Sequence, residues 1–117
     1  MNDPKKNVCI IDDDEPVREH LRHILEGAGY GVYEASNGRE GMALLAQYPC
    51  DIVLTDLIMP EKEGFETMRE IKGAHPLCKV IAISGSSYLI MASALGADAV
   101  VSKPFTKEII VKALNSI

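Results

Sequence analysis

Four acidic residues come directly after the first apolar run of the sequence, and a further aspartate ends a later run. The stretch VCIIDDDEP carries Asp12, Asp13, Asp14 and Glu15, and the stretch DIVLTD ends at Asp56. Carboxylates that lie close together raise one another's pKa, and a hard divalent cation relieves this conflict by binding to them. The acids therefore predict a Mg²⁺ site in which Asp56 joins Asp12 and Asp13.

A hydroxyl group and an ammonium group complete a set that suits phosphoryl transfer. The stretch KVIAIS ends at Ser84, and AVVSKP carries Lys103. A metal at the acids would attract phosphate, and a carboxylate oxygen of Asp56 could then attack phosphorus to form an aspartyl phosphate. Lys103 would neutralise charge on the phosphoryl group, and the Ser84 hydroxyl would hydrogen-bond to one of its oxygens.

Each of these residues also has an ordinary structural explanation. Asp14 and Glu15 precede Pro16 and suit the start of a helix, so we assign them to capping rather than to metal binding. A single aspartate before a loop is commonly a turn residue, and a lysine before proline is commonly solvated. The functional interpretation therefore depends on the whole combination lying at one place.

Short apolar runs alternate with amphipathic segments and predict the elements that would bring these residues together. Strands are expected at Asn7–Ile11, Gly31–Ala35, Asp51–Thr55, Lys79–Ile83 and Ala99–Ser102. Helices are expected at Val17–Ala28, at Met42–Ala46, from Phe65 until Gly73 and Pro76, at Tyr88–Leu95, and at Ile109–Ile117 with Thr106 as its N-cap. This alternation indicates an α/β fold with a parallel sheet covered on both faces, whose ligands bind at the carboxyl ends of the strands.

Composition and length limit the class of protein. The chain has 117 residues and a net charge of −5, which indicates one domain without an electrostatic surface for nucleic acid or an anionic membrane. Cys9, Cys50 and Cys78 lie far apart without a CxxC motif, so we expect reduced thiols and a cytoplasmic protein. The uncharged stretch Val80–Ala97 contains SGSS, which favours a strand, a loop and a helix over a membrane span.

Five stretches, taken in order, resemble the receiver domain of two-component response regulators over essentially the whole chain. They are IIDDDEPVRE (10–19), DIVLTDLIMP (51–60), EGFE (63–66), VIAISG (80–85) and GADAVVSKPF (96–105). The resemblance implies a flavodoxin-like, five-stranded parallel sheet in the order 2-1-3-4-5 and a single receiver domain over residues 1–117. It also implies phosphoryl transfer from a phosphohistidine of a sensor histidine kinase or phosphotransfer protein, with later hydrolysis by the receiver itself.

The resemblance also implies roles for individual residues of the site. Asp56 matches the phosphoacceptor, Asp13 matches the direct Mg²⁺ ligand and Asp12 matches its water-linked partner. The backbone carbonyl of Ile58 matches a further metal ligand, and Mn²⁺ is a possible substitute for Mg²⁺. Because Ile58 and Ser86 would flank the pocket and limit access of water, we expect slow autohydrolysis.

Ser84 and Lys103 match the switch hydroxyl and the phosphate-contacting lysine of the family, in which the bond corresponding to Lys103–Pro104 is typically cis. One position departs from the family pattern, because Val100 stands where many receivers carry an aromatic ring that swings inward. We therefore expect phosphorylation to move the loop after Ser84 and the fourth helix without an aromatic switch.

The segment between Ser84 and Lys103 is shorter than in many receivers, and its predicted helix YLIMASALGA has no charge. This helix is either buried on more than one side or exposed as a patch for an unknown downstream protein or a second copy. The resemblance implies a possible homodimer through the fourth-helix and fifth-strand face. No residues remain for an effector domain, so we expect either a protein that acts alone or a part of a longer regulator.

Three other functions fit the sequence less well than a receiver does. An aspartyl-phosphate phosphatase would carry a second acid two residues after its nucleophile, where this chain has Ile58. A degenerate receiver would bind partners without phosphate, although all the expected pocket positions are chemically competent. A flavin-binding protein of the flavodoxin type is disfavoured because the chain has no Trp and no glycine-rich phosphate loop.

Overall fold

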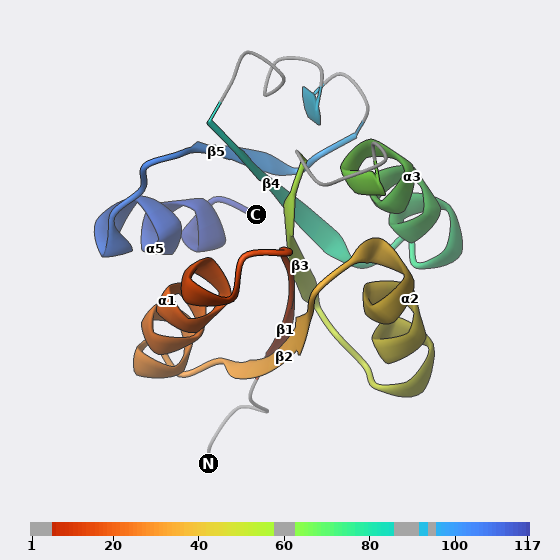
Figure 1. Ribbon diagram of the computed structural model, residues 1–117, viewed down its shortest axis with the longest axis horizontal. Helices are drawn as coiled ribbons and strands as arrows, with labels where there is room; N and C mark the ends of the chain where they lie inside the picture. Colours follow the sequence, from red (N-terminus) through yellow and green to blue (C-terminus); the bar gives the residue numbers. More distant parts are fainter. Residues whose placement is uncertain (1–5, 58–62, 86–91, 94–95) are drawn as a thin grey trace.

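The computed structural model describes residues 6–57, 63–85, 92–93 and 96–117, which form a five-stranded parallel sheet in the order β2-β1-β3-β4-β5 (Figure 1). The strands are β1 (Asn7–Ile11), β2 (Gly31–Ala35), β3 (Ile52–Asp56), β4 (Lys79–Ser84) and β5 (Ala99–Ser102). The predicted α/β class and strand order are confirmed. The third strand lies one residue later than expected, and the fourth extends to Ser84.

Helices cover both faces of this sheet, as the unbroken apolar strands predicted (Figure 1). Helices α1 (Glu15–Gly27) and α5 (Lys107–Asn115) lie on one face, and α2 (Gly38–Gln47) and α3 (Glu63–Ala74) lie on the other. The predicted helix Tyr88–Leu95 lies mostly outside the described residues. No helix in the described ranges is long and apolar enough to cross a membrane.

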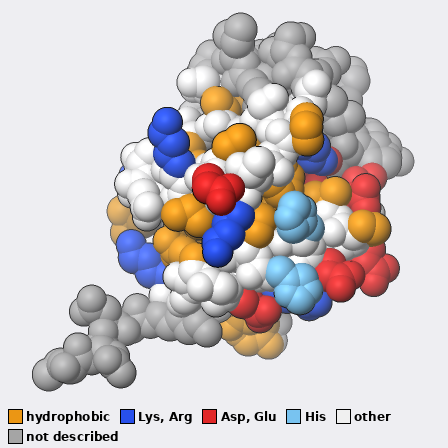
Figure 2. Space-filling model, turned by 90° about the vertical axis from the view of Figure 1, so that its left-hand side faces the viewer, with side chains coloured by type: hydrophobic (Ala, Val, Ile, Leu, Met, Phe, Trp, Pro, Cys, Tyr) orange, Lys and Arg blue, Asp and Glu red, His pale blue; other side chains and the backbone are white. Residues whose placement is uncertain are grey.

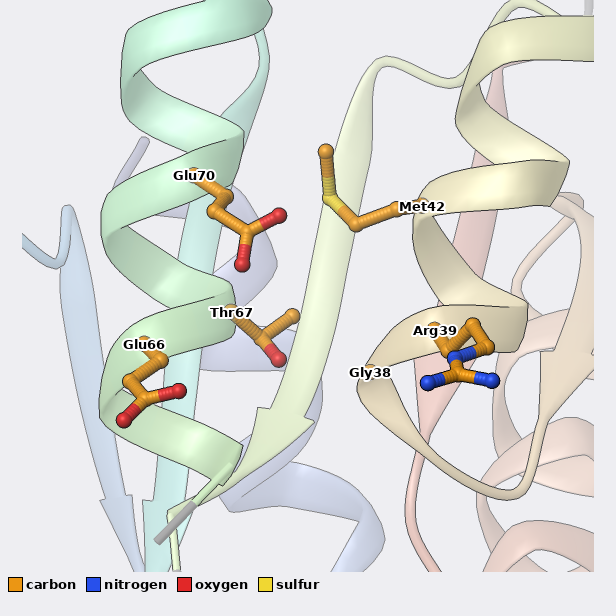
Figure 3. A pocket seen from close by; sticks show the side chains of 6 residues that line it. All are labelled: Gly38, Arg39, Met42, Glu66, Thr67 and Glu70. Atoms are coloured by element: carbon orange, nitrogen blue, oxygen red, sulfur yellow. The ribbon is translucent and has the colours of Figure 1, made fainter.

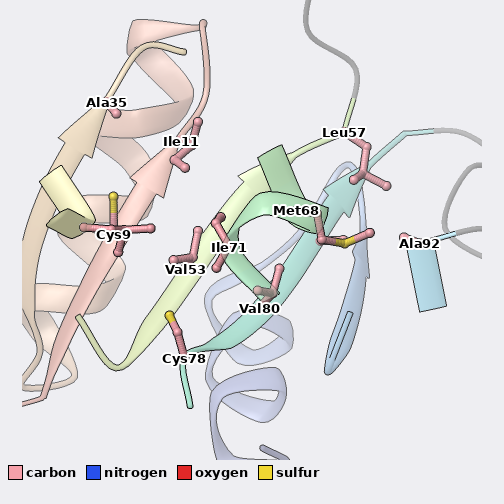
Figure 4. Close-up of a cluster of buried hydrophobic side chains, with 12 residues drawn as sticks. Cys9, Ile11, Ala35, Val53, Leu57, Met68, Ile71, Cys78, Val80 and Ala92 are labelled. Atoms are coloured by element: carbon pink, nitrogen blue, oxygen red, sulfur yellow. The ribbon is translucent and has the colours of Figure 1, made fainter. Parts of the chain in front are cut away.

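Successive residues of the central strands enter opposite layers of the core. Val8 and Ile10 of β1 pack in the layer under α1 and α5, and Cys9 and Ile11 pack in the layer under α2 and α3. All four side chains are completely buried. Figure 4 shows the second layer, to which Met68 of α3 also contributes. The sheet therefore separates two apolar clusters, as expected for a pleated strand buried on both faces.

The helix ends follow local capping chemistry. The Asn37 side chain accepts a hydrogen bond from the Glu40 backbone N–H at 2.9 Å and caps α2. The predicted cap of α5 is confirmed, because Thr106 Oγ1 accepts from the Ile109 backbone N–H at 3.2 Å. After α1, Gly29 adopts a left-handed φ of 94°, which glycine adopts without steric cost.

The ends of two helices depend on the residues next to them. Helix α3 ends at Ala74, between Gly73 and Pro76, the two residues expected to end it; Gly73 itself stays in the helix because one glycine costs a helix only about 1 kcal/mol. The chain leaves the helix at His75, which precedes Pro76 and is therefore biased away from helical geometry. The second helix begins at Gly38, four residues before Met42, because the Asn37 cap lies there.

The face formed by α1 and α5 carries acidic and basic side chains among apolar ones, with histidine side chains close to the acids (Figure 2). His20 of α1 stacks on Phe105, which follows β5, with their ring centroids 5.4 Å apart. This ring contact links α1 to the segment that carries Lys103.

Candidate functional site

Most of the predicted site residues that the structure describes lie at the carboxyl edge of the sheet; Val100, near the start of β5, does not. Asp12 directly follows β1, Asp56 and Ser84 end β3 and β4, and Lys103 directly follows β5. Because the strands are parallel and in register, their carboxyl ends meet at this edge. Asp13 also lies at this edge, next to Asp12.

Three carboxylates form a group that could hold a metal ion. Each of Asp12, Asp13 and Asp56 offers one oxygen, and these oxygens lie within 4.8 Å of one another. Asp12 and Asp56 are buried, with 1% and 6% of their surface exposed, whereas Asp13 is exposed. A few carboxylates of which one is exposed to solvent suit Mg²⁺, because this ion keeps several of its water ligands and binds through few carboxylates.

Lys103 provides positive charge inside this acidic group. Its Nζ lies 3.1 Å from Asp56 Oδ2 and 3.5 Å from Asp12 Oδ2. Burial disfavours the charged ammonium, but the hydrogen bond to Asp56 and the charges of both carboxylates outweigh it, so the pKa of Lys103 lies above its ordinary value. The lysine therefore stays protonated at physiological pH and balances part of the negative charge.

The Asp12 carboxyl has a pKa above its ordinary value. Burial is the largest cause, and the charge of Asp56 adds to it. The backbone N–H of Asp14, which donates to Asp12 Oδ1 at 2.8 Å, and the charge of Lys103 act in the opposite direction. A cation bound at the group would favour the ionised form further, because it interacts only with the charged carboxylate.

The expected placement of Asp14 and Glu15 at the start of the first helix is confirmed. Asp14 occupies the N-cap position of α1, but its side chain makes no capping hydrogen bond. The Asp14 backbone N–H instead donates a hydrogen bond to Asp12 Oδ1, so the Asp12 side chain fixes the turn from β1 into the helix.

Sequence reasoning also missed Arg18, whose Nη1 donates to the Asp12 carbonyl oxygen at 2.6 Å. The sequence offered one signal for a contact of Arg18 with this turn, because Arg18 comes one helical turn after Asp14.

Comparison with known proteins identifies the family. A family model of the response regulator receiver domain matches residues 8–115. The chain belongs to the response regulator receiver family. Among solved structures, this receiver is similar to the chemotaxis protein CheY4 of Vibrio cholerae, with 26% identity and a TM-score of 0.89 over 96% of this chain and 98% of that one.

Two further receivers have similar structures. A response regulator receiver domain protein of Clostridium thermocellum has 30% identity and a TM-score of 0.87 over 94% of this chain and 91% of that one. The BeF3-activated receiver domain of DrrB has 25% identity and a TM-score of 0.83 over 96% of both chains. The agreement extends over nearly the whole receiver.

The remaining predicted positions of the receiver differ in how far the structure describes them. Ser84 is fully buried, and its backbone carbonyl accepts a hydrogen bond from the Lys103 N–H at 3.0 Å. The Lys103–Pro104 peptide bond is cis, as the resemblance implied. Val100 is 40% exposed on β5. Ile58 and Ser86 lie outside the described residues, so the expectations on the metal-binding carbonyl and on water access stay predictions.

Proposed function

We propose that this receiver accepts a phosphoryl group on Asp56 from a phosphohistidine of a sensor histidine kinase or phosphotransfer protein, in a Mg²⁺-dependent reaction. The supporting observation is the placement of Asp56 in one oxygen cluster with Asp12 and Asp13, while Lys103 Nζ lies 3.1 Å from Asp56 Oδ2. The resemblance to a receiver domain that has been activated with BeF3 also supports the proposal.

The chain's own residues would divide the work as follows. A carboxylate oxygen of Asp56 attacks phosphorus while the phosphorus–nitrogen bond to the donor histidine breaks, which leaves an aspartyl phosphate. Asp12, Asp13, Asp56 and the Ile58 carbonyl would hold Mg²⁺, or Mn²⁺ in its place, and the bound ion would supply positive charge that shields the phosphoryl oxygens. Lys103 would exchange its contact with the carboxylates for one with a phosphoryl oxygen.

The output would be a change of surface rather than catalysis on another substrate. The receiver catalyses only its own phosphorylation and dephosphorylation. When Asp56 is phosphorylated, the Ser84 hydroxyl moves toward the phosphoryl group and hydrogen-bonds to one of its oxygens. Because Val100 replaces the aromatic ring of many receivers, the movement would pass through the segment after Ser84. We place this single domain, residues 1–117, in the cytoplasm, where it would bind a downstream protein or form a homodimer through its fourth-helix and fifth-strand face.

Intact mass after incubation with acetyl phosphate and Mg²⁺ tests the proposal. We expect the mass to rise by one phosphoryl group, and to stay unchanged with Asp56→Asn or with a chelator. Asp14→Asn is the matched control, because Asp14 is an exposed acid next to the metal-binding group that does not belong to it. This variant should still gain the phosphoryl group.

A folded protein that gains no mass would contradict the proposal and favour a receiver that signals by binding alone. Gain of mass by Asp56→Asn would show that another residue is the acceptor. Multiple turnover of a small phosphate ester would instead favour a phosphatase, and this assay uses the same samples.

A further inference from the structure

Three cysteines border one core layer on the side of the sheet that faces α2 and α3. Cys9 lies within β1, Cys50 comes two residues before β3, and Cys78 comes directly before β4. Cys9 and Cys78 belong to the buried cluster (Figure 4). Cys50 packs against this cluster. All three are free thiols. Cys50 and Cys78 lie before the amino ends of their strands, away from the acidic edge.

A surface cleft leads to this group of thiols. It has a volume of about 340 Å³, and its lining includes Cys50, Cys78, His75 and Leu77. Cys50 is half-buried, whereas Cys9 is fully buried and Cys78 is 5% exposed. A small solute in the cleft would therefore meet the Cys50 sulfur more readily than the other two.

The surroundings make Cys50 the thiol that ionises most readily. Its hydrogen bond with the Cys9 thiol lowers the pKa of Cys50, against the opposing effects of burial and the Asp51 charge. The same hydrogen bond, together with burial, raises the pKa of Cys9, which is therefore the partner that keeps its proton. Burial and the neighbouring Cys50 raise the pKa of Cys78 to about 11. The thiolate is the reactive form of cysteine, so Cys50 is the nucleophile of the group.

We propose that Cys50 reacts with hydrogen peroxide and that the neighbouring Cys9 thiol then forms a disulfide with it. In the first step the Cys50 thiolate attacks one peroxide oxygen, the O–O bond breaks, and Cys50 becomes a sulfenic acid while hydroxide leaves. In the second step the Cys9 sulfur attacks the sulfenic sulfur. Water leaves, carrying the Cys9 proton, and the two thiols together have reduced one peroxide to water.

The positions of the two cysteines in the fold suit this sequence of steps. Cys50 lies in the connection between α2 and β3, outside helix and strand, where the backbone can shift. Cys9 is fixed within a central strand between β2 and β3. The disulfide would tie the connection to β1, the strand that leads into Asp12. This inference does not depend on the proposed phosphoryl transfer.

Peroxide treatment followed by mass spectrometry under non-reducing conditions tests the proposal. We expect the intact mass to fall by that of two hydrogen atoms, and a digest to contain one peptide pair joined through Cys9 and Cys50. The change should be lost in Cys50→Ser and retained in Cys78→Ser, which is the matched control because Cys78 lines the same cleft. In Cys9→Ala the sulfenic acid should persist on Cys50, where dimedone would trap it.

Several results would overturn the proposal. A disulfide between Cys50 and Cys78 would contradict it, and so would a disulfide that still forms in Cys50→Ser. It would also be contradicted if Cys50 of the wild-type protein stayed reduced while another thiol reacted. Circular dichroism of each variant shows whether a variant that does not react is still folded. If Cys9→Ala does not fold, the peptide pair joined in the wild-type protein still tests the proposal.

Discussion

Lys103 is held between two buried carboxylates, which makes it the internal counter-ion of the acidic edge. Its contacts with Asp56 and Asp12 are 3.1 Å and 3.5 Å long. Removal of one member of such a group leaves the others buried without compensation, which is costly. The two contacts would have to be exchanged for one with a phosphoryl oxygen if Asp56 accepts a phosphoryl group, because Lys103 Nζ now lies within 3.1 Å of the Asp56 carboxylate.

At the residue scale, we expect Asp13→Asn to weaken Mg²⁺ binding by about tenfold or more, because it removes one carboxylate of the proposed Mg²⁺ site. Asp14→Asn, one residue further along, should leave the affinity nearly unchanged. The rise in melting temperature with added Mg²⁺ measures both, since a ligand that binds only the folded state stabilises it. Equal losses in the two variants would show that general negative charge, rather than this group, attracts the ion.

At the scale of elements, Asp98 joins three segments of the fold. Its Oδ2 accepts from the Val80 backbone N–H at 2.8 Å and lies 3.0 Å from Lys72 Nζ of α3. Burial opposes ionisation, but the hydrogen bonds from Val80 and Lys72 and the lysine charges outweigh it and hold the pKa of Asp98 below its ordinary value. The ionised carboxylate therefore ties α3 and the start of β4 to the segment before β5.

The lowered pKa gives Asp98→Asn a pH-dependent effect on stability. The ionised group stabilises the fold above its unfolded-state pKa of 3.8, and this contribution is lost as the pH falls through the lower folded-state pKa. We expect the variant to lose about 0.5–1.5 kcal/mol at pH 7, measured by urea unfolding. The difference from wild type should shrink below pH 3.8. A difference that stays constant with pH would mean that the charge contributes nothing.

The contact between α2 and α3 depends on the absence of a side chain at Gly38. A Cβ there would lie 2.0 Å from Thr67 Oγ1 and 3.2 Å from Thr67 Cβ. Figure 3 shows the two residues facing each other in a pocket of about 300 Å³ between the helices. Gly38→Ala should therefore lower the free energy of unfolding by about 1–3 kcal/mol.

Adding Thr67→Ala to Gly38→Ala should recover part of this loss, because it removes the clashing hydroxyl. Gly27→Ala is the matched control, since nothing lies within 4 Å of a Cβ at that position of α1. Urea unfolding of the variants measures these effects. Equal effects of Gly38→Ala and Gly27→Ala would contradict a steric role of Gly38.

At the scale of the whole molecule, the sequence predicted the sheet well because its strands are short and apolar, and the central strands β1, β3 and β4 are buried on both faces. The Asn7–Ile11 and Gly31–Ala35 strands were predicted without error, since apolar runs bounded by turn residues give clear limits. The acids, Ser84 and Lys103 could be assigned to one edge because parallel strands end together. Sequence could not reveal that Asp12, rather than Asp14, holds the start of α1, since that choice depends on the turn geometry after β1.

The division of the core into two layers has a consequence for the additivity of substitutions. Ile71 of α3 and Ile110 of α5 are both fully buried, but they belong to clusters on opposite faces of the sheet. Ile71→Val and Ile110→Val should each cost about 0.5–1.5 kcal/mol. The double variant should cost their sum to within about 0.5 kcal/mol, because residues without shared partners act independently. One layer could then be repacked by design while the other keeps its native sequence.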